Sequence, residues 1–270
     1  MKVGNTPLVW LDGLSRQLDC NLYAKLEYMN PTGSHKDREM QAVVEDMKRR
    51  GFKECAVASS GNAALSLSYF CWCENFQCHI FGAQNDLKKK RSILDIFRPI
   101  YHLAPTYERS CGQLTELCLV RSDIYNANAG VCPVRIEADG KIIAELEEVL
   151  PDVVICPVNN GTLYLGLKNA ITPLSKPRLV GVKAEHTQLA SSLHGFYNRE
   201  QVTDNIIEVG DNDIRWATKE LCHEGFIVEP SSATTLAGVK KLNEVKGKTV
   251  VLILTGNGLK YPSELAEALK

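Results

Sequence analysis

A lysine at the start of a predicted helix is the best candidate in this chain for covalent chemistry. Residues 31–34 form a Pro-Thr-Gly-Ser turn that leads directly into an amphipathic segment, which places Lys36 in the first turn of a helix. The positive end of a helix disfavours a charged lysine and therefore favours the amine that attacks an aldehyde. A solvated surface lysine beside a capping serine is the simpler interpretation, and this segment alone favours it.

Three other segments place small polar residues and glycine directly after an apolar run: residues 59–62, 159–162 and 255–258. Loops of this kind at the carboxyl ends of parallel strands offer hydroxyls and unpaired helix amides to a carboxylate or a phosphate. Taken alone, each is also an ordinary helix cap or a flexible turn. Residues 159–162 are not followed by the lysine and hydroxyl residue of a nucleoside-triphosphate loop.

The elements that must position these residues alternate along the chain. Helical patterns separate apolar runs that predict strands, and one of these patterns, at residues 37–50, has a clear apolar face and ends at Gly51. The predicted strands are residues 22–26, 55–58, 78–81, 100–103, 153–158, 179–182 and 250–254. This alternation predicts an α/β fold with a mainly parallel sheet. No flexible linker divides the chain, so a second domain would have to be inserted.

Composition limits the classes of partner. The 270 residues include 31 Lys and Arg against 32 Asp and Glu, so no net field attracts nucleic acid or an anionic membrane. We expect a small-molecule partner instead. The start of the chain has no apolar signal core and no run is long enough to span a bilayer, so we expect a cytoplasmic protein.

Cysteine is frequent, with ten residues, and we expect free thiols in a reducing compartment. The group Cys71, Cys73 and Cys78 would need a fourth ligand such as His79 to hold a metal, and its spacing fits no standard zinc pattern. Cys71 and Cys73 also lie in an apolar stretch, residues 65–76, that predicts a buried helix. We therefore predict that these cysteines belong to the core and that the chain has no metal site.

Taken together and in this order, the segments resemble threonine synthase and its relatives among the fold type II pyridoxal-phosphate enzymes, the tryptophan synthase β superfamily. The resemblance extends over nearly the whole chain. It begins with Gly-Asn-Thr-Pro-Leu at residues 4–8, continues with Pro-Thr-Gly-Ser-x-Lys-Asp-Arg at 31–38 and ends with Thr-Gly-x-Gly-Leu-Lys at 255–260. It implies two three-layer αβα domains with mainly parallel sheets: a larger cofactor domain of residues 1–30 and 136–270, and a smaller inserted domain of residues 31–135.

The resemblance also implies a set of residues that bind pyridoxal 5'-phosphate. Lys36 matches the Schiff-base lysine, and His35 would lie near the cofactor phosphate. The ring would be contacted by Asn62 at its hydroxyl and by Thr255 at its nitrogen. The phosphate would be held by Asn159, Asn160, Gly161, Thr162 and Leu163.

The same resemblance implies an amino-acid substrate. Ser59, Ser60 and Gly61 would bind its α-carboxylate, and Arg135 matches an arginine that helps to bind a substrate phosphate. Ala129 and Gly130 stand where the family places Asn-Ser shortly before that arginine, so the assignment of phosphohomoserine is open to an alternative.

A neutral Thr255 hydroxyl would not keep the cofactor ring nitrogen protonated, which favours elimination or replacement over transamination. The leading expectation is elimination or replacement at the β or γ carbon, as in the conversion of phosphohomoserine to threonine and phosphate. One alternative is β-elimination or β-replacement on a serine- or cysteine-type substrate. Another is a non-catalytic cofactor-binding partner or carrier protein. A homodimer is the default expectation.

Overall fold

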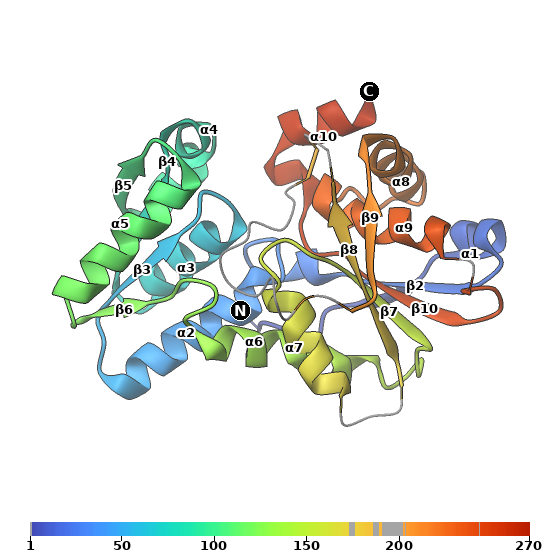
Figure 1. Ribbon diagram of the computed structural model, residues 1–270, viewed down its shortest axis with the longest axis horizontal. Helices are drawn as coiled ribbons and strands as arrows, with labels where there is room; N and C mark the ends of the chain where they lie inside the picture. The colour runs from blue at the N-terminus through green and yellow to red at the C-terminus, as the bar shows by residue number, and fades with distance from the viewer. Residues whose placement is uncertain (1, 173–175, 186–188, 191–201, 203, 243) are drawn as a thin grey trace. The chain divides into compact units, whose positions relative to one another are not determined.

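The chain divides into two units, one of which is inserted in the sequence of the other (Figure 1). A computed structural model describes residues 2–172, 176–185, 189–190, 202, 204–242 and 244–270. Unit 1 comprises Met1–His35 and Asp139–Lys270, and unit 2 comprises Lys36–Ala138. The predicted inserted domain, residues 31–135, overlaps unit 2 over residues 36–135, whereas the turn that precedes Lys36 lies in unit 1.

Unit 1 is built on a six-stranded sheet in the order β1-β2-β10-β7-β8-β9. Among the described strands, β1 alone is antiparallel to its neighbour, β2, and the other pairs are parallel. The strands are β1 (Leu8–Trp10), β2 (Asn21–Lys25), β7 (Val153–Pro157), β8 (Arg178–Ala184), β9 (Ile206–Val209) and β10 (Thr249–Ile253). The four strands predicted in this part of the chain are confirmed, while the short β1 and β9 were not predicted.

Helices cover both faces of this sheet. They are α1 (Asp12–Leu18), α7 (Thr162–Ile171), α8 (Asp211–His223), α9 (Pro230–Lys241) and α10 (Pro262–Leu269), with short 3-10 turns at Glu27–Met29, Ile143–Leu146 and Gly258–Lys260. A side chain added at Gly181 of β8 would meet Tyr164 of α7, whereas Val182 contacts Gly238 of α9. Because neighbouring strand residues point to opposite faces, α7 and α9 lie on opposite sides of the sheet.

Unit 2 is built on a four-stranded parallel sheet in the order β5-β4-β3-β6. Its strands are β3 (Glu54–Ala58), β4 (Gln77–Ala83), β5 (Ile100–Ala104) and β6 (Ile124–Asn126). Its helices are α2 (Lys36–Arg50), α3 (Asn62–Cys73), α4 (Gln84–Leu94) and α5 (Tyr107–Val120), with a 3-10 turn at Asp95–Phe97, and α6 (Pro133–Gly140) leads back into unit 1. The three predicted strands of this unit are confirmed.

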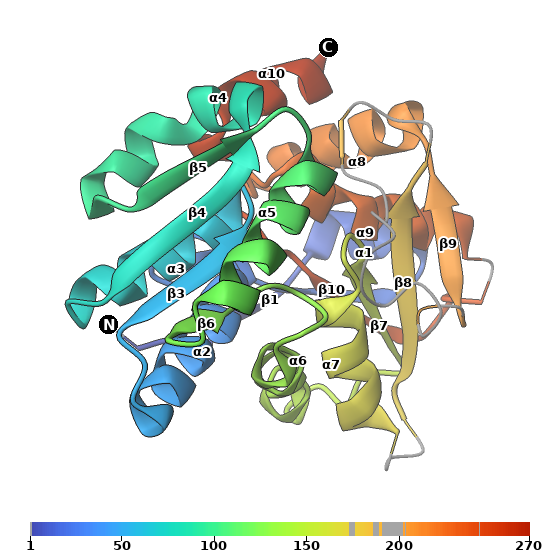
Figure 2. The same cartoon turned by 60° about the vertical axis from the view of Figure 1, so that its left-hand side comes forward.

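The core of unit 2 has two parts, one on each face of the sheet. Met40, Val57 and Ile80 belong to the face covered by α2 and α3, and Phe81 and Leu114 belong to the face covered by α5. Figure 2 shows α5 in front of β3 and β4, with α2 and α3 behind them. Each unit is therefore a helix–sheet–helix arrangement, as predicted. No helix among the described residues has the length and apolar character needed to cross a membrane.

Two helix predictions in unit 2 have different outcomes. The helix predicted at residues 37–50 is α2, and Gly51, with φ of +80°, ends it as expected. The buried helix predicted at residues 65–76 is α3, which begins earlier and ends at Cys73. Cys71 is buried but Cys73 is exposed, so the prediction that Cys73 belongs to the core is wrong. It lies at the last position of the helix, where the chain turns towards β4.

Candidate active site

The carboxyl ends of β7 and β10 bring two predicted segments of unit 1 to one edge of the sheet. The two strands are neighbours and parallel, so the loops that follow them start at the same edge. Thr255 follows β10 and is 4% exposed. Its hydroxyl oxygen lies 3.0 Å from that of Ser232, which also accepts a hydrogen bond of 2.9 Å from the Gly256 amide. Ser232, near the start of α9, therefore fixes the position of Thr255.

The predicted phosphate loop lies between β7 and α7. Gly161 has φ of +85°, a left-handed conformation that glycine adopts without strain, and the helix begins at the next residue. The Thr162 amide donates a 3.1 Å hydrogen bond to the Asn160 side chain. The Thr162 hydroxyl is buried, and no hydrogen-bond partner for it exists among the residues that the structure describes. A buried hydroxyl at a helix start is a donor ready for an anion.

The turn before Lys36 is held beside Thr255 by main-chain hydrogen bonds within unit 1. The His35 amide donates to the Thr255 carbonyl at 2.9 Å, and the Asn257 amide donates to the Gly33 carbonyl at 3.1 Å. Gly33 has φ of +83°, which the turn requires. The Ser34 hydroxyl is fully buried and, within the described ranges, has no hydrogen-bond partner. The backbone that leads to Lys36 is thus fixed at the sheet edge where Thr255 lies.

The N-terminal motif of residues 4–8 stabilises the same turn. The Gly4 amide donates to the Asn30 side chain at 2.9 Å, and the Thr6 hydroxyl donates to the Glu27 carboxylate at 2.7 Å. The Asn30 amide group donates to the other Glu27 oxygen at 3.0 Å. Glu27 is fully buried and was not singled out from the sequence. A carboxylate followed by an asparagine three residues later was the available signal for a local hydrogen-bonded turn.

In unit 2, Lys36 is the first residue of α2 and belongs to a buried charged group. Its amine forms an ion pair with the carboxylate of Glu39, and the Arg135 guanidinium lies 2.5 Å from the other oxygen of that carboxylate. Arg135 also donates to the Ala127 carbonyl at 2.8 Å. The side chains of Lys36, Glu39 and Arg135 are 12%, 0% and 2% exposed. The predicted substrate-phosphate role of Arg135 would therefore require its pair with Glu39 to open.

Glu39 is the residue of this group that sequence reasoning missed. It follows Lys36 by three positions on α2, so the two side chains share one face of the helix. That spacing was a visible signal, but the pairing of Glu39 with Arg135 joins positions far apart in the sequence and was not.

The segment Ser59–Asn62 connects β3 to the start of α3. The Ser59 amide donates to the Phe81 carbonyl at 2.9 Å, which ties the segment to β4. The Gly61 amide donates to the Ser59 hydroxyl at 3.2 Å. Gly61 precedes the helix with no side-chain cap, and a side chain added there would meet nothing within 4 Å. The start of α3 in unit 2 therefore borders open space, as a carboxylate site requires.

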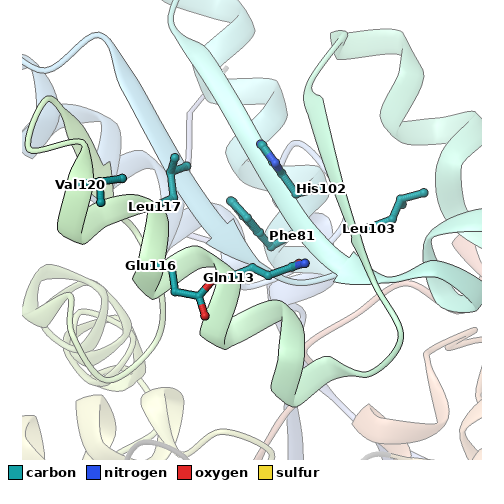
Figure 3. Close-up of a pocket in the computed structure, with 7 residues that line it drawn as sticks. All are labelled: Phe81, His102, Leu103, Gln113, Glu116, Leu117 and Val120. Carbon is teal, nitrogen blue, oxygen red and sulfur yellow. The ribbon is translucent and has the colours of Figure 1, made fainter.

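A separate groove of about 460 Å³ lies on unit 2, between α5 and the ends of β4 and β5 (Figure 3). His102 stacks on Phe81 with ring centroids 4.1 Å apart, and burial together with His79 lowers the pKa of His102. The lining residues are Phe81, His102, Leu103, Gln113, Glu116, Leu117 and Val120. None of the predicted site residues belongs to this lining, so the groove is distinct from the candidate site.

Comparison with known proteins gives a match to the family described as "Pyridoxal-phosphate dependent enzyme" over residues 1–256. Among curated relatives, the threonine synthase of a Bacillus species is 31% identical and covers 96% of this chain and 84% of its own length. The threonine synthase of Mycobacterium tuberculosis is 28% identical over 96% of this chain and 82% of its own length.

Solved structures with the same arrangement of elements include O-acetyl serine sulfhydrylase isoform 3 from Entamoeba histolytica. It has a TM-score of 0.88 at 21% identity and matches 99% of this chain and 90% of its own. An O-ureido-L-serine synthase has a TM-score of 0.87 at 18% identity, over 99% of this chain and 94% of its own. At these identities the likeness concerns the fold.

Proposed function

Because the chain belongs to the family of pyridoxal-phosphate dependent enzymes, we propose that it catalyses elimination or replacement at the β or γ carbon of an amino acid. Its cofactor is pyridoxal 5'-phosphate, and its fold is the tryptophan-synthase-β-like fold type II, as the resemblance implied. The observation that carries the proposal is the position of Lys36, the first residue of α2, directly after a turn that is hydrogen-bonded to the Thr255 loop.

The phosphate loop of unit 1 fits the cofactor phosphate. Thr162 has a buried hydroxyl with no hydrogen-bond partner in the part of the chain that the structure describes, and such a group costs free energy until it is paired. The first turn of α7 adds main-chain amides at the positive end of a helix. We propose that Asn159, Asn160, Gly161, Thr162 and Leu163 bind the phosphate, and that His35 lies near it.

The remaining predicted site residues would act on the reacting part of the cofactor and substrate. When bound, the cofactor supplies an electron-withdrawing ring that makes the substrate α carbon acidic. We propose that Lys36 binds the cofactor aldehyde and, once free, moves the proton at Cα. Asn62 would contact the ring hydroxyl, and Ser59, Ser60 and Gly61 would orient the substrate carboxylate.

Thr255 supports elimination or replacement over transamination. Its hydroxyl shares a hydrogen bond with Ser232, and both groups are neutral. A neutral partner leaves the ring nitrogen unprotonated, which makes the ring a weaker electron sink than a carboxylate partner would. This favours loss or exchange of a side-chain group.

Two substrate classes remain, and each is supported by a different observation. The threonine synthases among the relatives support phosphohomoserine, whose conversion to threonine releases phosphate. The ion pair between Arg135 and Glu39 supports the second class, a serine- or cysteine-type amino acid without a second anionic group, because the guanidinium already has an anionic partner. We propose phosphohomoserine first and the serine or cysteine type second.

The visible absorption spectrum of the purified protein tests cofactor and substrate together. We expect a band from the lysine-bound cofactor that shifts with one member of a panel containing phosphohomoserine, O-acetylserine, serine and threonine. A band that no amino acid perturbs would support a non-catalytic partner or carrier protein. Absence of any band after addition of the cofactor would contradict the proposed role of Lys36.

The cellular setting and assembly are further parts of the proposal. We propose a cytoplasmic enzyme that forms a symmetric dimer, the commonest assembly of soluble enzymes. Light scattering of the purified full chain would measure its mass in solution, and a mass of one chain would contradict the dimer.

A further inference from the structure

Three cysteines that are distant in the sequence meet in the interior of unit 2. Cys55 of β3 and Cys78 of β4 are direct partners in the parallel sheet, so their side chains leave the same face. Cys71 of α3 lies over that face, with its sulfur 3.3 Å from the sulfur of Cys55. All three sulfurs lie within 4.8 Å of one another. The group considered from the sequence was Cys71, Cys73 and Cys78. In the structure Cys73 is exposed, and Cys55 is the third buried member instead.

The spacing of the three sulfurs suits one central ion. Bonds of about 2.3 Å between thiolate sulfur and a soft ion, at angles of roughly 90 to 110°, place the sulfurs about 3.3 to 3.8 Å apart. The Cys55 and Cys71 sulfurs lie 3.3 Å apart, and no two of the three sulfurs are more than 4.8 Å apart, so the observed spacing is compatible with that range. Small rotations of the side chains would therefore bring all three sulfurs to a common ion.

The charge of the complex decides which class of ion fits. Cys55, Cys71 and Cys78 are 0%, 0% and 3% exposed and belong to the apolar cluster formed by α2, α3 and the sheet. A net charge is costly in such surroundings. Three thiolates around monovalent copper would leave two negative charges, and around divalent zinc they would leave one. Three thiolates around a trivalent ion are neutral.

A zinc site would also need a fourth ligand. Among the residues that the structure describes, no further His, Cys, Asp or Glu ligand joins the group of three. The Ser68 hydroxyl, 3.8 Å from the Cys78 sulfur, is placed to donate a hydrogen bond to that sulfur. A three-coordinate ion that prefers sulfur meets both conditions, charge and ligand number.

We propose that Cys55, Cys71 and Cys78 form a binding site for a trivalent, sulfur-preferring metalloid ion, with arsenic(III) as the probe. The reaction of arsenous acid with the three thiols forms three arsenic–sulfur bonds and releases three water molecules. Each thiol gives its proton to a departing hydroxide, and no group is oxidised or reduced. The site is independent of the elimination or replacement chemistry proposed above.

The rate of binding follows from the burial of the three sulfurs. Because the three sulfurs are buried, uptake must wait for local opening of unit 2.

Intact-mass spectrometry of the full-length enzyme loaded with cofactor would test the site after incubation with arsenite. We expect a single adduct whose added mass is one arsenic atom less three hydrogens, which separates three bonds to sulfur from two. Cys71→Ala and Cys78→Ala should weaken uptake at least tenfold. Cys73→Ala, on the same helix, and Cys111→Ala, a buried cysteine of the same unit, should not change it.

X-ray absorption of the wild-type adduct tests the site even if the alanine variants fail to fold. Three sulfur neighbours around arsenic would support the site. An adduct with two sulfur neighbours, an adduct retained in Cys71→Ala, or no adduct at all would overturn the proposal. A loss of two hydrogens without arsenic would show a disulfide and would overturn it as well.

Discussion

The two units prepare their candidate site residues in opposite ways. In unit 1 the loops around Thr162 and Ser34 contain buried hydroxyls with no hydrogen-bond partner among the described residues. In unit 2 the ionisable side chains of Lys36, Glu39 and Arg135 satisfy one another in a buried group. Unit 1 is therefore ready to receive an anion from outside the chain, whereas in unit 2 the ion pair with Glu39 must open before Lys36 can take the role proposed for it.

This difference suggests that the groups of unit 1 are suited to binding and those of unit 2 to reaction. Main-chain amides and neutral hydroxyls bind a phosphate without changing their own charge, and they need no rearrangement to do so. A lysine paired with a carboxylate must leave that ion pair before it can attack an aldehyde. We infer that unit 1 contributes mostly affinity for the cofactor and that unit 2 contributes the control of reactivity.

Replacement of Lys36 by alanine should have the largest effect, because it removes the only reactive amine proposed for the site. We expect turnover of every substrate to fall by roughly 10²–10⁴-fold or more, the usual contribution of a positioned proton carrier. Stopped assays for amino-acid products would measure the change. Lys48→Ala, at an exposed position of the same helix, is the control and should keep full activity. Equal activity in the two variants would show that Lys36 is not required for the reaction.

Replacement of Arg135 by alanine should mainly affect stability. Loss of one partner from a buried ion pair leaves a buried charge uncompensated and costs about 3–5 kcal/mol in free energy of unfolding. Arg109→Ala breaks an exposed pair with Glu116 in the same unit and should change that free energy by no more than about 1 kcal/mol.

Urea unfolding of both variants would measure this difference. If Arg135→Ala is instead as stable as the wild type and selectively loses activity with phosphohomoserine, the arginine is a substrate ligand and the second substrate class is disfavoured.

Replacement of Thr162 by valine tests whether the phosphate loop of unit 1 is ready to bind an anion. The valine removes a buried hydroxyl without a partner, so the protein without cofactor should be no less stable than the wild type. Affinity for pyridoxal phosphate should fall about 10- to 100-fold, because a hydrogen bond to a charged phosphate is worth about 1.5–3 kcal/mol.

Thr218→Val is the matched control, since the Thr218 hydroxyl donates to the Ile214 carbonyl at 2.8 Å inside α8. It should lower stability and leave cofactor affinity unchanged. Fluorescence titration of the cofactor-free proteins would measure both affinities, and an unchanged affinity in Thr162→Val would argue against the phosphate loop.

Replacement of Gly61 by alanine should have the smallest effect. Its added methyl group would enter open space, so stability should stay within about 0.5 kcal/mol. If the substrate carboxylate uses that space, KM should rise roughly three- to tenfold, equivalent to about 0.7–1.4 kcal/mol, because the methyl group would push the carboxylate away from its main-chain donors. Gly210→Ala, another glycine before a helix with open space around it, is the control for KM. Equal KM values in the two variants would place the carboxylate elsewhere.

Most of the fold was predictable because its signals are local and long. The seven predicted strands have five to seven residues in the structure, so each of them, like the amphipathic helix α2, is long enough to show its pattern in the sequence. The strands that were not predicted, β1, β6 and β9, have three or four residues, too few for a pattern. The candidate site loops could be proposed from the family motifs because each motif is a short continuous segment.

The missed features of the site depend on distant pairs. Glu39 meets Arg135, and Cys55 meets Cys78, only because the chain folds α6 against α2 and pairs β3 with β4 within unit 2. Neither pair is indicated by a regular spacing of residues along the sequence. The exposure of Cys73 was missed because the predicted helix was placed three residues too late in the chain, although its apolar residues were correctly identified.

The contact between Val182 and Gly238 has a consequence for how this protein can change over evolutionary time. A Cβ at position 238 would lie 2.5 Å from a Val182 methyl group, so helix α9 can approach the sheet only while residue 238 is glycine or residue 182 becomes smaller. Across homologues, a larger residue at one of the two positions should therefore occur together with a smaller residue at the other. A chimera that takes α9 from one parent and β8 from another should fold only when its residue 238 is glycine or its residue 182 is smaller than valine.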